Sequence, residues 1–375
     1  MSLTVAPVRT KTDMKKFLEL PWKIYKENKY WVPPLLNDLR DTLDRNKNKS
    51  LNRIDFELFI ALLDGEPAGR LLVGIDNNLN KQKGISMGYF SLFESIEDYA
   101  VAELLLDTAS QWFRERNITR MMGPVSPTGT DGDEYRGLLI DCFDRPPVLM
   151  NTYNPPYYQR FLEDYGFEKD HDLFAYFLDS KEMFSKDPAK VIGYAMKKYN
   201  FRVETLDVKN IDREIKDLKH VLDLAVPDEW PDLVPPSLED VKEMARKLLP
   251  VADPDIIIIA RSGDEAIGFG IALPDYNQIL IHLNGRITPL AALKYLWYKR
   301  KINCARFFVM FVVPAFRKKG VSYAIYYQTF LNGTKKGFIY GEGSTIGETN
   351  TRMRNDIESF GGQRYKTYRV YAREL

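Results

Sequence analysis

Apolar and polar positions follow the same order in the two halves of the chain. Each half contains a hairpin pattern, in which two runs rich in β-branched or aromatic residues flank a turn that contains glycine. The runs are Glu57–Leu63 and Gly69–Ile75 in the first half, and Ile256–Arg261 and Ile267–Leu273 in the second. This shared order predicts an internal repeat.

A strand and an amphipathic helix are predicted after each hairpin. Ser86–Phe93 precedes a helix near Asp98–Arg116, and Arg306–Val313 precedes a helix near Ser322–Lys335. Apolar residues recur in both helices at three- and four-residue spacing, which favours one buried face. Short strands are then predicted at Thr119–Met122 and Phe338–Gly341.

Each half closes with a further helix and strand. The two helices follow Asn154 and Asn350, and glycines 166 and 361 are expected to cap their C-terminal ends. Closing strands are predicted at Leu173–Leu178 and Tyr365–Tyr371. The patterns predict an α/β fold of two similar domains, residues 1–180 and 181–375, with the charged segment 179–190 as a plausible linker.

Composition and charge narrow the class of protein. The chain has 375 residues, 45% of them hydrophobic, and a formal net charge of +1. A net charge this close to zero does not attract nucleic acid or an anionic membrane, so we expect neither partner. A local basic patch is the alternative that the net charge does not exclude. The longest apolar run, Phe307–Phe316, is too short to span a bilayer.

Cysteine and histidine usage indicates the compartment and the metal chemistry. Cys142 and Cys304 are the two cysteines, and the first twenty residues lack the apolar stretch of a secretory signal. We therefore expect a cytoplasmic protein. The three histidines lie far apart without metal-ligand spacing, so no metal site is predicted.

The segment most suggestive of chemistry is Phe311–Ala324, which reads FVVPAFRKKGVSYA. Pro314 ends strand pairing, and the chain then turns through Arg317, Lys318, Lys319 and Gly320 into a helix. Unpaired N–H groups at a helix N-terminus bind phosphate, and glycine lets a pyrophosphate approach the backbone. A broken strand pairing would leave a slot for an extended ligand. The alternative is a charged turn on a solvated surface.

This segment resembles the pyrophosphate loop of the GNAT acyltransferase superfamily, which reads Arg or Gln, two residues, Gly, one residue, then Gly or Ala. Arg317, Gly320 and Ser322 occupy those positions, and Ser322 departs from the pattern while staying small. Asn350 and the Phe360-Gly361-Gly362 ending resemble the family's closing segment. The resemblance implies two GNAT-like domains in tandem, each with a mixed, largely antiparallel sheet flanked by helices.

The resemblance also implies acetyl-CoA or another acyl-CoA as the acyl donor. It places the pyrophosphate on Arg317, Lys318, Lys319, Gly320, Val321 and Ser322, and the pantetheine against Phe311, Val312 and Val313. Asn350 is expected near the pantetheine or the thioester. The acceptor would be a small-molecule or peptide amine that attacks the thioester directly.

The catalytic groups follow the family less closely. The family often has a general-acid Tyr four residues before the Gly of its Gly-Phe pair, and that position is Ile357 here. Glu342 is our candidate general base because its strand leads to the expected thioester slot. The alternative for Glu342 is a solvent-facing or salt-bridged carboxylate.

The first half differs at the matching turn. Glu94, Glu97 and Asp98 lie where the second half has its basic turn. Carboxylates there can cap a helix but repel a pyrophosphate. We therefore expect that the first domain does not bind CoA and that it completes the acceptor cleft or stiffens the second domain.

Three functions are compatible with these residues. The first is an acyl-CoA-dependent N-acyltransferase, and the second is a catalytically degenerate GNAT-like binding protein. The third is a tandem-GNAT transferase that uses an aminoacyl-tRNA donor, which the net charge of +1 does not favour. The sequence leaves the acceptor, the acyl chain length and the oligomeric state undetermined.

Overall fold

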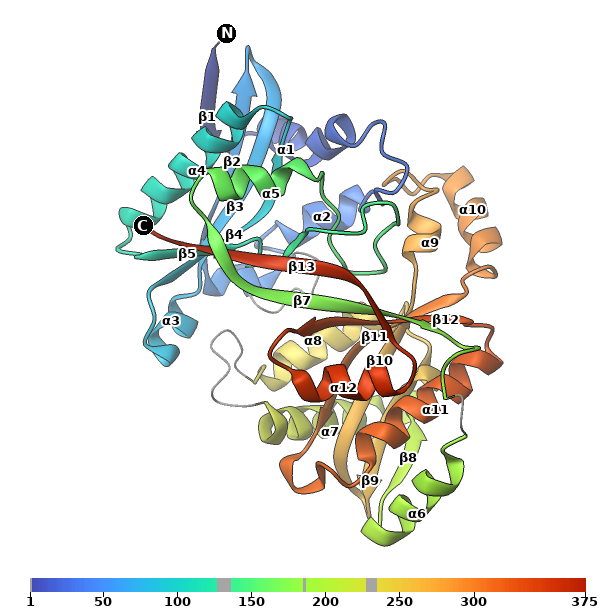
Figure 1. Cartoon of the computed structure of the whole chain (residues 1–375). Coiled ribbons are helices and arrows are strands. Elements are labelled where there is room, and N and C mark those ends of the chain that lie inside the picture. Colours follow the sequence, from blue (N-terminus) through green and yellow to red (C-terminus); the bar gives the residue numbers. More distant parts are fainter. Residues whose placement is uncertain (1, 127–135, 185–186, 227–234) are drawn as a thin grey trace. The chain divides into compact units, whose positions relative to one another are not determined.

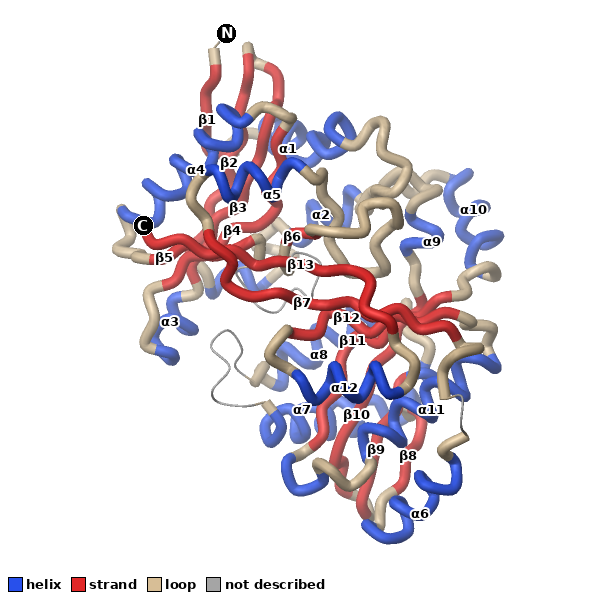
Figure 2. Tube along the Cα trace, in the orientation of Figure 1, coloured by secondary structure: helices blue, strands red, loops and turns tan. Residues whose placement is uncertain are grey.

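The computed structural model describes residues 2–126, 136–184, 187–226 and 235–375. The chain divides into two compact units, which can be followed along the sequence in Figure 1. Unit 1 comprises Met1–Leu173, Asn277–Arg300 and Lys366–Leu375, and unit 2 comprises Phe174–Tyr276 and Lys301–Tyr365. Both units combine a mixed sheet with helices, as the strands and helices of Figure 2 show.

The sheet of unit 1 is antiparallel except for one pair. Its order is β1 (Leu3–Pro7), β2 (Asp55–Leu63), β3 (Glu66–Ile75), β4 (Met87–Ser95) and β5 (Arg120–Gly123). β4 and β5 are parallel, and the C-terminal end of β13 (Gln363–Glu374) lies antiparallel to β5. The two-residue strand β6 (Leu138–Leu139) also pairs with β13.

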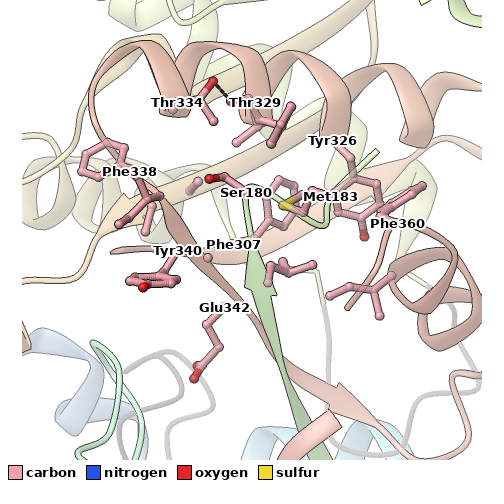
Figure 3. Close-up of a pocket in the computed structure, with 18 residues that line it drawn as sticks. Ser180, Met183, Phe307, Tyr326, Thr329, Thr334, Phe338, Tyr340, Glu342 and Phe360 are labelled. Carbon is pink, nitrogen blue, oxygen red and sulfur yellow. Dashed lines mark hydrogen bonds between the residues drawn. The ribbon is translucent and has the colours of Figure 1, made fainter. Parts of the chain in front are cut away.

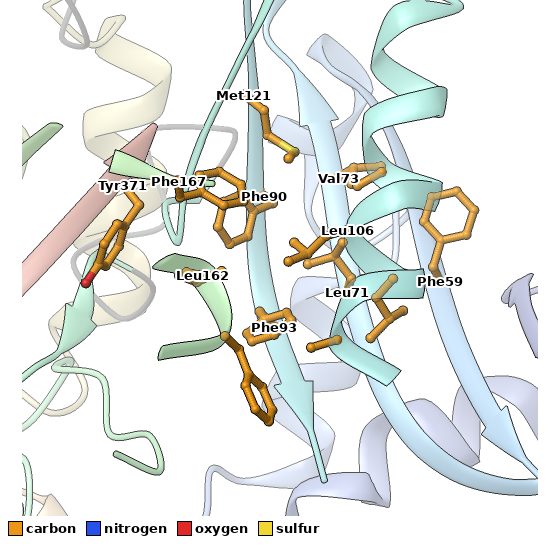
Figure 4. Packing of buried hydrophobic residues seen from close by; sticks show 14 of the residues in the cluster. Phe59, Leu71, Val73, Phe90, Phe93, Leu106, Met121, Leu162, Phe167 and Tyr371 are labelled. Carbon is orange, nitrogen blue, oxygen red and sulfur yellow. The ribbon is translucent and has the colours of Figure 1, made fainter. Parts of the chain in front are cut away.

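Helices cover both faces of this sheet. α4 (Tyr99–Arg114) and α5 (Tyr157–Asp164) pack on one face, and α1 (Lys11–Ile24) and α2 (Leu36–Thr42) pack on the other. Unit 1 also contains α3 (Asn77–Lys83), α9 (Asn277–Leu280), α10 (Pro289–Lys299) and a 3₁₀ turn at Lys49–Arg53. Successive residues of a strand point to opposite faces. Phe59 and Leu71 pack with Leu106 of α4 (Figure 4), whereas Leu58 and Leu72 pack in the second core, with α1 and α2.

Unit 2 repeats this arrangement. Its strand order is β12 (Tyr340–Gly347), β11 (Cys304–Val312), β10 (Glu265–Pro274), β9 (Ile257–Ser262) and β8 (Arg202–Thr205). Only β11 and β12 among these neighbours are parallel. Its helices are α6 (Ala189–Tyr199), α7 (Ile211–Ala225), α8 (Leu238–Leu248), α11 (Val321–Lys335) and α12 (Thr351–Ser359), with 3₁₀ turns at Val208–Asn210, Pro254–Ile256 and Pro314–Phe316.

The two units are not consecutive pieces of sequence. β7 (Glu168–Asp179) begins in unit 1 and continues in unit 2, whereas β13 begins in unit 2 and continues in unit 1. The segment 277–300 lies between β10 and β11 in sequence but belongs to unit 1. The two units therefore do not match two domains divided at residue 180. Local sequence patterns could not predict this, because they do not show which distant segments pack together.

Most predicted elements are confirmed. Both hairpins form, and the helices and closing strands lie where the patterns place them. The strand predicted at Phe338–Gly341 instead begins at Tyr340 and extends to Gly347.

Among the described residues, no helix has the length and apolar character needed to cross a bilayer. These residues also contain no cluster of three or more His, Cys, Asp or Glu that could hold a metal.

Candidate active site in unit 2

A gap between two parallel strands forms the centre of the site. β11 pairs with β12 only from Cys304 opposite Tyr340 to Phe307 opposite Gly343. The remaining residues of β11, Phe308–Val312, extend beyond this register and are half-buried. On its other edge β11 stays paired with β10 as far as Val312. A slot therefore lies beside β11, but pairing with β12 ends at Phe307, seven residues before Pro314, so this proline does not cause the gap.

The basic turn lies at the open end of this gap. A 3₁₀ turn at Pro314–Phe316 follows β11, and Lys318 and Gly320 then take positive φ values of 63° and 83°. Gly320 is the N-cap of α11, and no side chain caps this helix. The first N–H groups of α11 thus lack helical acceptors and are available to an anion.

Arg317 holds this turn in place. Its Nε donates to the carbonyl of Val312 at 3.2 Å, and its Nη2 donates to the carbonyl of Ala225, at the end of α7, at 2.9 Å. Lys318 is exposed, whereas the Lys319 ammonium lies 4.8 Å from the centre of the Phe316 ring. Ser322 is half-buried in the first turn of α11. The turn thus combines open backbone donors with local positive charge.

Asn350 caps α12 at the end of β12. The side-chain oxygen of Asn350 accepts the backbone N–H of Met353 at 3.2 Å. The backbone N–H of Asn350 donates to the carbonyl of Gly347. This cap explains why the helix begins at Thr351. The structure therefore assigns Asn350 a helix-capping interaction, and its contact with a thioester stays a prediction.

Glu342 is buried in a polar network. Only 1% of its surface is exposed, which excludes the solvent-facing alternative. Ser344 donates to one carboxylate oxygen at 2.5 Å, and the Tyr365 hydroxyl donates to the other. Arg306 donates from Nε to the Ser344 hydroxyl at 2.9 Å and from Nη2 to the Ser344 carbonyl at 3.0 Å.

The strand register places this network on one face of the sheet. Arg306 is opposite Glu342, and Phe307 is opposite Gly343. Partners in register share a face, so the Glu342 carboxylate lies on the face away from Phe307. The Phe307 ring packs 4.8 Å from that of Tyr326 of α11. In Figure 3 the Glu342 carboxylate points away from the aromatic side chains near α11.

A cavity of about 80 Å³ lies on the opposite, α11 side of the sheet. Carbon-rich side chains form most of its wall, together with the backbone of β12 (Figure 3). The wall includes Met183, Phe307, Tyr326, Thr329, Phe338 and Phe360. The cavity therefore begins beside the last paired residues of β11, where the strand gap closes.

Two buried hydroxyls in this wall have no hydrogen-bond partner among the described residues. They belong to Tyr326 and Thr329. Burial raises the pKa of Tyr326, so its hydroxyl keeps its proton at neutral pH. Buried polar groups are normally paired, so these hydroxyls could interact with a polar group in the cavity.

Ile357 occupies the position at which the GNAT family often has a general-acid Tyr. It is buried and lies over Gly343, so closely that a Cβ added to this glycine would come within 2.2 Å of the Ile357 Cδ1 atom. An apolar side chain therefore covers the apex of the strand gap. The hydroxyls of Tyr326 and Tyr365 lie on residues that contact Phe307 and Glu342, and the sequence did not assign either residue to the site.

Cys304 is not a nucleophile candidate. Burial raises the pKa of its thiol well above the usual range, and the negative charges of Asp275 and Glu342 add to the effect. The thiol is thus neutral and unreactive at neutral pH.

Unit 1 has a different arrangement at the equivalent turn. Asp98 caps α4 by accepting the N–H of Ala100 at 3.1 Å. The Glu94 side chain is 12% exposed and accepts the hydroxyls of Tyr25 and Tyr158 at 2.9 and 2.8 Å. Burial raises the pKa of Glu94, while Arg70, 3.6 Å away, opposes the shift. These carboxylates form a cap and a buried network, a setting unsuited to a pyrophosphate.

Comparisons with known proteins agree with this architecture. No protein-family model matches the chain. "Bacterial ceramide synthase" of Caulobacter vibrioides is 28% identical, with 100% of this chain and 98% of the relative covered. "Protein YghO" of Escherichia coli is 27% identical, with 97% and 94% covered.

Solved structures identify the fold. A tandem GNAT protein from the clavulanic acid biosynthesis pathway matches with a TM-score of 0.59 at 11% identity, covering 100% of this chain and 98% of that chain. A GCN5-related N-acetyltransferase from Sphaerobacter thermophilus matches with a TM-score of 0.54 at 12% identity, covering 99% and 95%. The chain therefore has the fold of the GNAT N-acetyltransferases, which confirms the fold expected from the sequence resemblance.

Proposed function

We propose that unit 2 is an acyl-CoA-dependent N-acyltransferase. The observation that carries the proposal is the gap between β11 and β12, which opens toward the Arg317–Ser322 turn and closes beside buried Glu342. A pyrophosphate at the N-terminus of α11 would direct the pantetheine along Phe311–Val313 into this gap. Asn350, at the end of β12, would lie near the pantetheine.

In the proposed reaction, the acceptor and the acyl chain lie on opposite faces of the sheet. An amine acceptor that approaches on the Glu342 face attacks the thioester carbonyl, so a C–N bond forms and the C–S bond breaks. Glu342 accepts the proton that the amine nitrogen loses, and the CoA thiolate departs. Ser344 and Tyr365 orient the carboxylate through their hydrogen bonds.

The acyl group would extend into the α11-side cavity. A cavity of about 80 Å³ exceeds the needs of an acetyl group and suits a chain of a few more carbons, because a dry cavity of about 150 Å³ holds benzene. The acceptor is a small-molecule or peptide amine. The name of the Caulobacter relative adds lipid amines to the candidates, since a ceramide is an N-acylated long-chain amino alcohol.

Calorimetry with acetyl-CoA and butanoyl-CoA tests the donor site. The native protein should bind, and Gly320→Glu should abolish binding because it adds a negative charge and a side chain at a φ of 83°. Gly337→Glu is the matched control, since Gly337 also has a positive φ and open space around it. Equal binding by both variants would refute the proposed site, as would absence of binding by the native protein.

A catalytically degenerate binding protein is the second candidate. Ile357 favours it, because the family's general acid is replaced by an apolar side chain. Release of free CoA in the presence of an amine panel separates the two functions. A protein that binds acyl-CoA and never releases CoA would be assigned to the second.

A further inference from the structure

The helix α10 presents an apolar face to solvent. Leu293, Leu296 and Trp297 are 65%, 64% and 57% exposed, and Ile287, just before the helix, is 69% exposed. These four residues are called the α10 face below. The spacing of three and four residues places the three helical members on one side, whereas Ala291 is buried. Contiguous exposed apolar residues of this size mark an interaction surface.

This helix is firmly built. Thr288 caps it by accepting the N–H of Ala291 at 3.1 Å, and Pro289 fills the first helical position. The ring of Tyr298 stacks on His282 at 4.0 Å. The apolar side chains are therefore held outward on an ordered helix.

The segment before α10 is anchored within unit 1. The indole N–H of Trp22 donates to the Asn284 side chain at 2.9 Å, and the N–H of Leu36 donates to the carbonyl of Gly285 at 3.0 Å. The Trp22 ring also packs so closely on Gly285 that a Cβ there would lie 2.3 Å from it. The fold thus fixes the segment that carries α10.

Positive charge surrounds the α10 face. Lys294, Lys299, Arg300 and Lys301 lie on the helix or immediately after it, and all four are exposed. The unit 1 segment 277–300 contains four Lys and Arg and no Asp or Glu, although the whole chain has a net charge of only +1. The average charge therefore conceals a strongly basic segment.

We propose that the α10 face binds the surface of an anionic lipid bilayer. Leucine and tryptophan side chains with flanking lysines are the composition of helices that lie in a membrane interface. The lysine stems can lie along the apolar boundary while their ammonium groups reach lipid phosphates. The absence of acidic residues from this segment favours anionic lipid over a protein surface of mixed charge.

This proposal differs from the expectation of no membrane partner, which rested on the net charge and on the short apolar run Phe307–Phe316. It does not depend on the proposed acyl transfer, because α10 and the Arg317–Ser322 turn are separate features. If both proposals hold, α10 would bring the protein to surfaces that contain lipid amines.

Vesicle co-sedimentation tests the proposal. We expect the native protein to sediment with vesicles of three parts phosphatidylcholine to one part phosphatidylglycerol, and not with phosphatidylcholine alone. Binding should weaken steeply with added salt because the attraction is electrostatic. Trp297 emission should shift to shorter wavelength with the anionic vesicles, and Trp297→Phe should remove this shift.

Two double variants separate the apolar and charged contributions. Leu293→Ser with Leu296→Ser should abolish sedimentation, and Lys299→Gln with Arg300→Gln should weaken it about 25-fold, at about fivefold for each cation. All four side chains are exposed, so circular dichroism should be unchanged. Val191→Ser with Val208→Ser, which alters exposed apolar residues elsewhere, should bind like the native protein.

Three results would overturn the proposal. They are absence of binding to anionic vesicles at low salt, equal binding by the native protein and both α10 variants, and loss of binding in the Val191 and Val208 control. A concentration-dependent dimer that only the leucine variant disrupts, without vesicle binding, would assign the α10 face to a second copy of the chain. Failure of acyl-CoA binding would leave these outcomes unaffected.

Discussion

The hydroxyl of Tyr365 donates a hydrogen bond to the carboxylate of Glu342, which joins the start of β13 to β12. Ser344 donates to the other carboxylate oxygen, so both oxygens of Glu342 are held. A carboxylate held from two sides on one face of the sheet is well placed to receive a proton in a fixed direction. These two hydrogen bonds give the Glu342 carboxylate a defined orientation, which supports its role as the candidate base.

Glu342→Gln should lower kcat for acyl transfer about 100-fold or more while leaving acyl-CoA binding unchanged, because the amide cannot accept the proton. Tyr365→Phe should lower kcat about 10-fold, since the base is retained but one orienting hydrogen bond is lost. Release of CoA, measured at saturating donor, gives both values. Glu358→Gln, an exposed change on α12, is the control, and a Glu342→Gln enzyme with native kcat would exclude the base role.

Tyr326→Phe separates a structural from a functional role for its unpaired hydroxyl. A buried hydroxyl without a partner costs about 1–3 kcal/mol, so its removal should raise the free energy of unfolding of the ligand-free protein by about 1 kcal/mol. If the hydroxyl interacts with bound acyl-CoA, the same variant should bind donor more weakly. Denaturant unfolding and calorimetry measure the two effects. Destabilisation of the ligand-free variant would indicate a hydrogen bond to water or protein.

Local pattern was sufficient to predict the secondary structure around the candidate site. Pro314 and Gly320, together with the change from strand to helix periodicity, predicted the end of β11, the turn and the start of α11. Tyr365 and Arg306 could not be assigned to Glu342 in the same way, because strand register determines their proximity. The hydrophobic periodicity of a helix or strand shows which of its faces is apolar. It does not show which distant helix or strand packs against that face.

The same limit applies to the cavity and to α10. Ile357 was recognised as a departure from the family, but its packing over Gly343 depends on the angle between α12 and β12. The segment 277–300 could not be assigned to unit 1 from sequence, since the contacts of Asn284 and Gly285 with Trp22 join positions about 260 residues apart.

Substitutions at Gly333 should test the α11-side cavity. Gly333→Ala should raise the free energy of unfolding by about 1 kcal/mol, because alanine favours helix and a Cβ there lies at ordinary contact distance from Phe338. Gly333→Leu adds a larger side chain at the cavity wall. It should lower activity with butanoyl-CoA more than with acetyl-CoA, as measured by kcat/KM. An unchanged ratio in Gly333→Leu would place the acyl chain elsewhere.

The buried carboxylate of unit 1 predicts a pH dependence of stability. Burial raises the pKa of Glu94 above its ordinary value of 4.5, so the folded protein keeps this proton at pH values where the unfolded chain has lost it. The contribution of Glu94 to stability is then fully present below pH 4.5. It decreases as pH rises from 4.5 through the raised pKa, and it is constant above that.

Glu94→Gln removes this titration. The free energy of unfolding of the native protein, minus that of Glu94→Gln, should therefore decrease as pH rises above 4.5. Denaturant unfolding at several pH values measures the difference, which cancels the titration of the other carboxylates. Glu97→Gln, an exposed change three residues away, is the matched control variant. A difference for Glu94→Gln that increases with pH would mean that Arg70 and the two tyrosines stabilise the ionised carboxylate more than burial disfavours it.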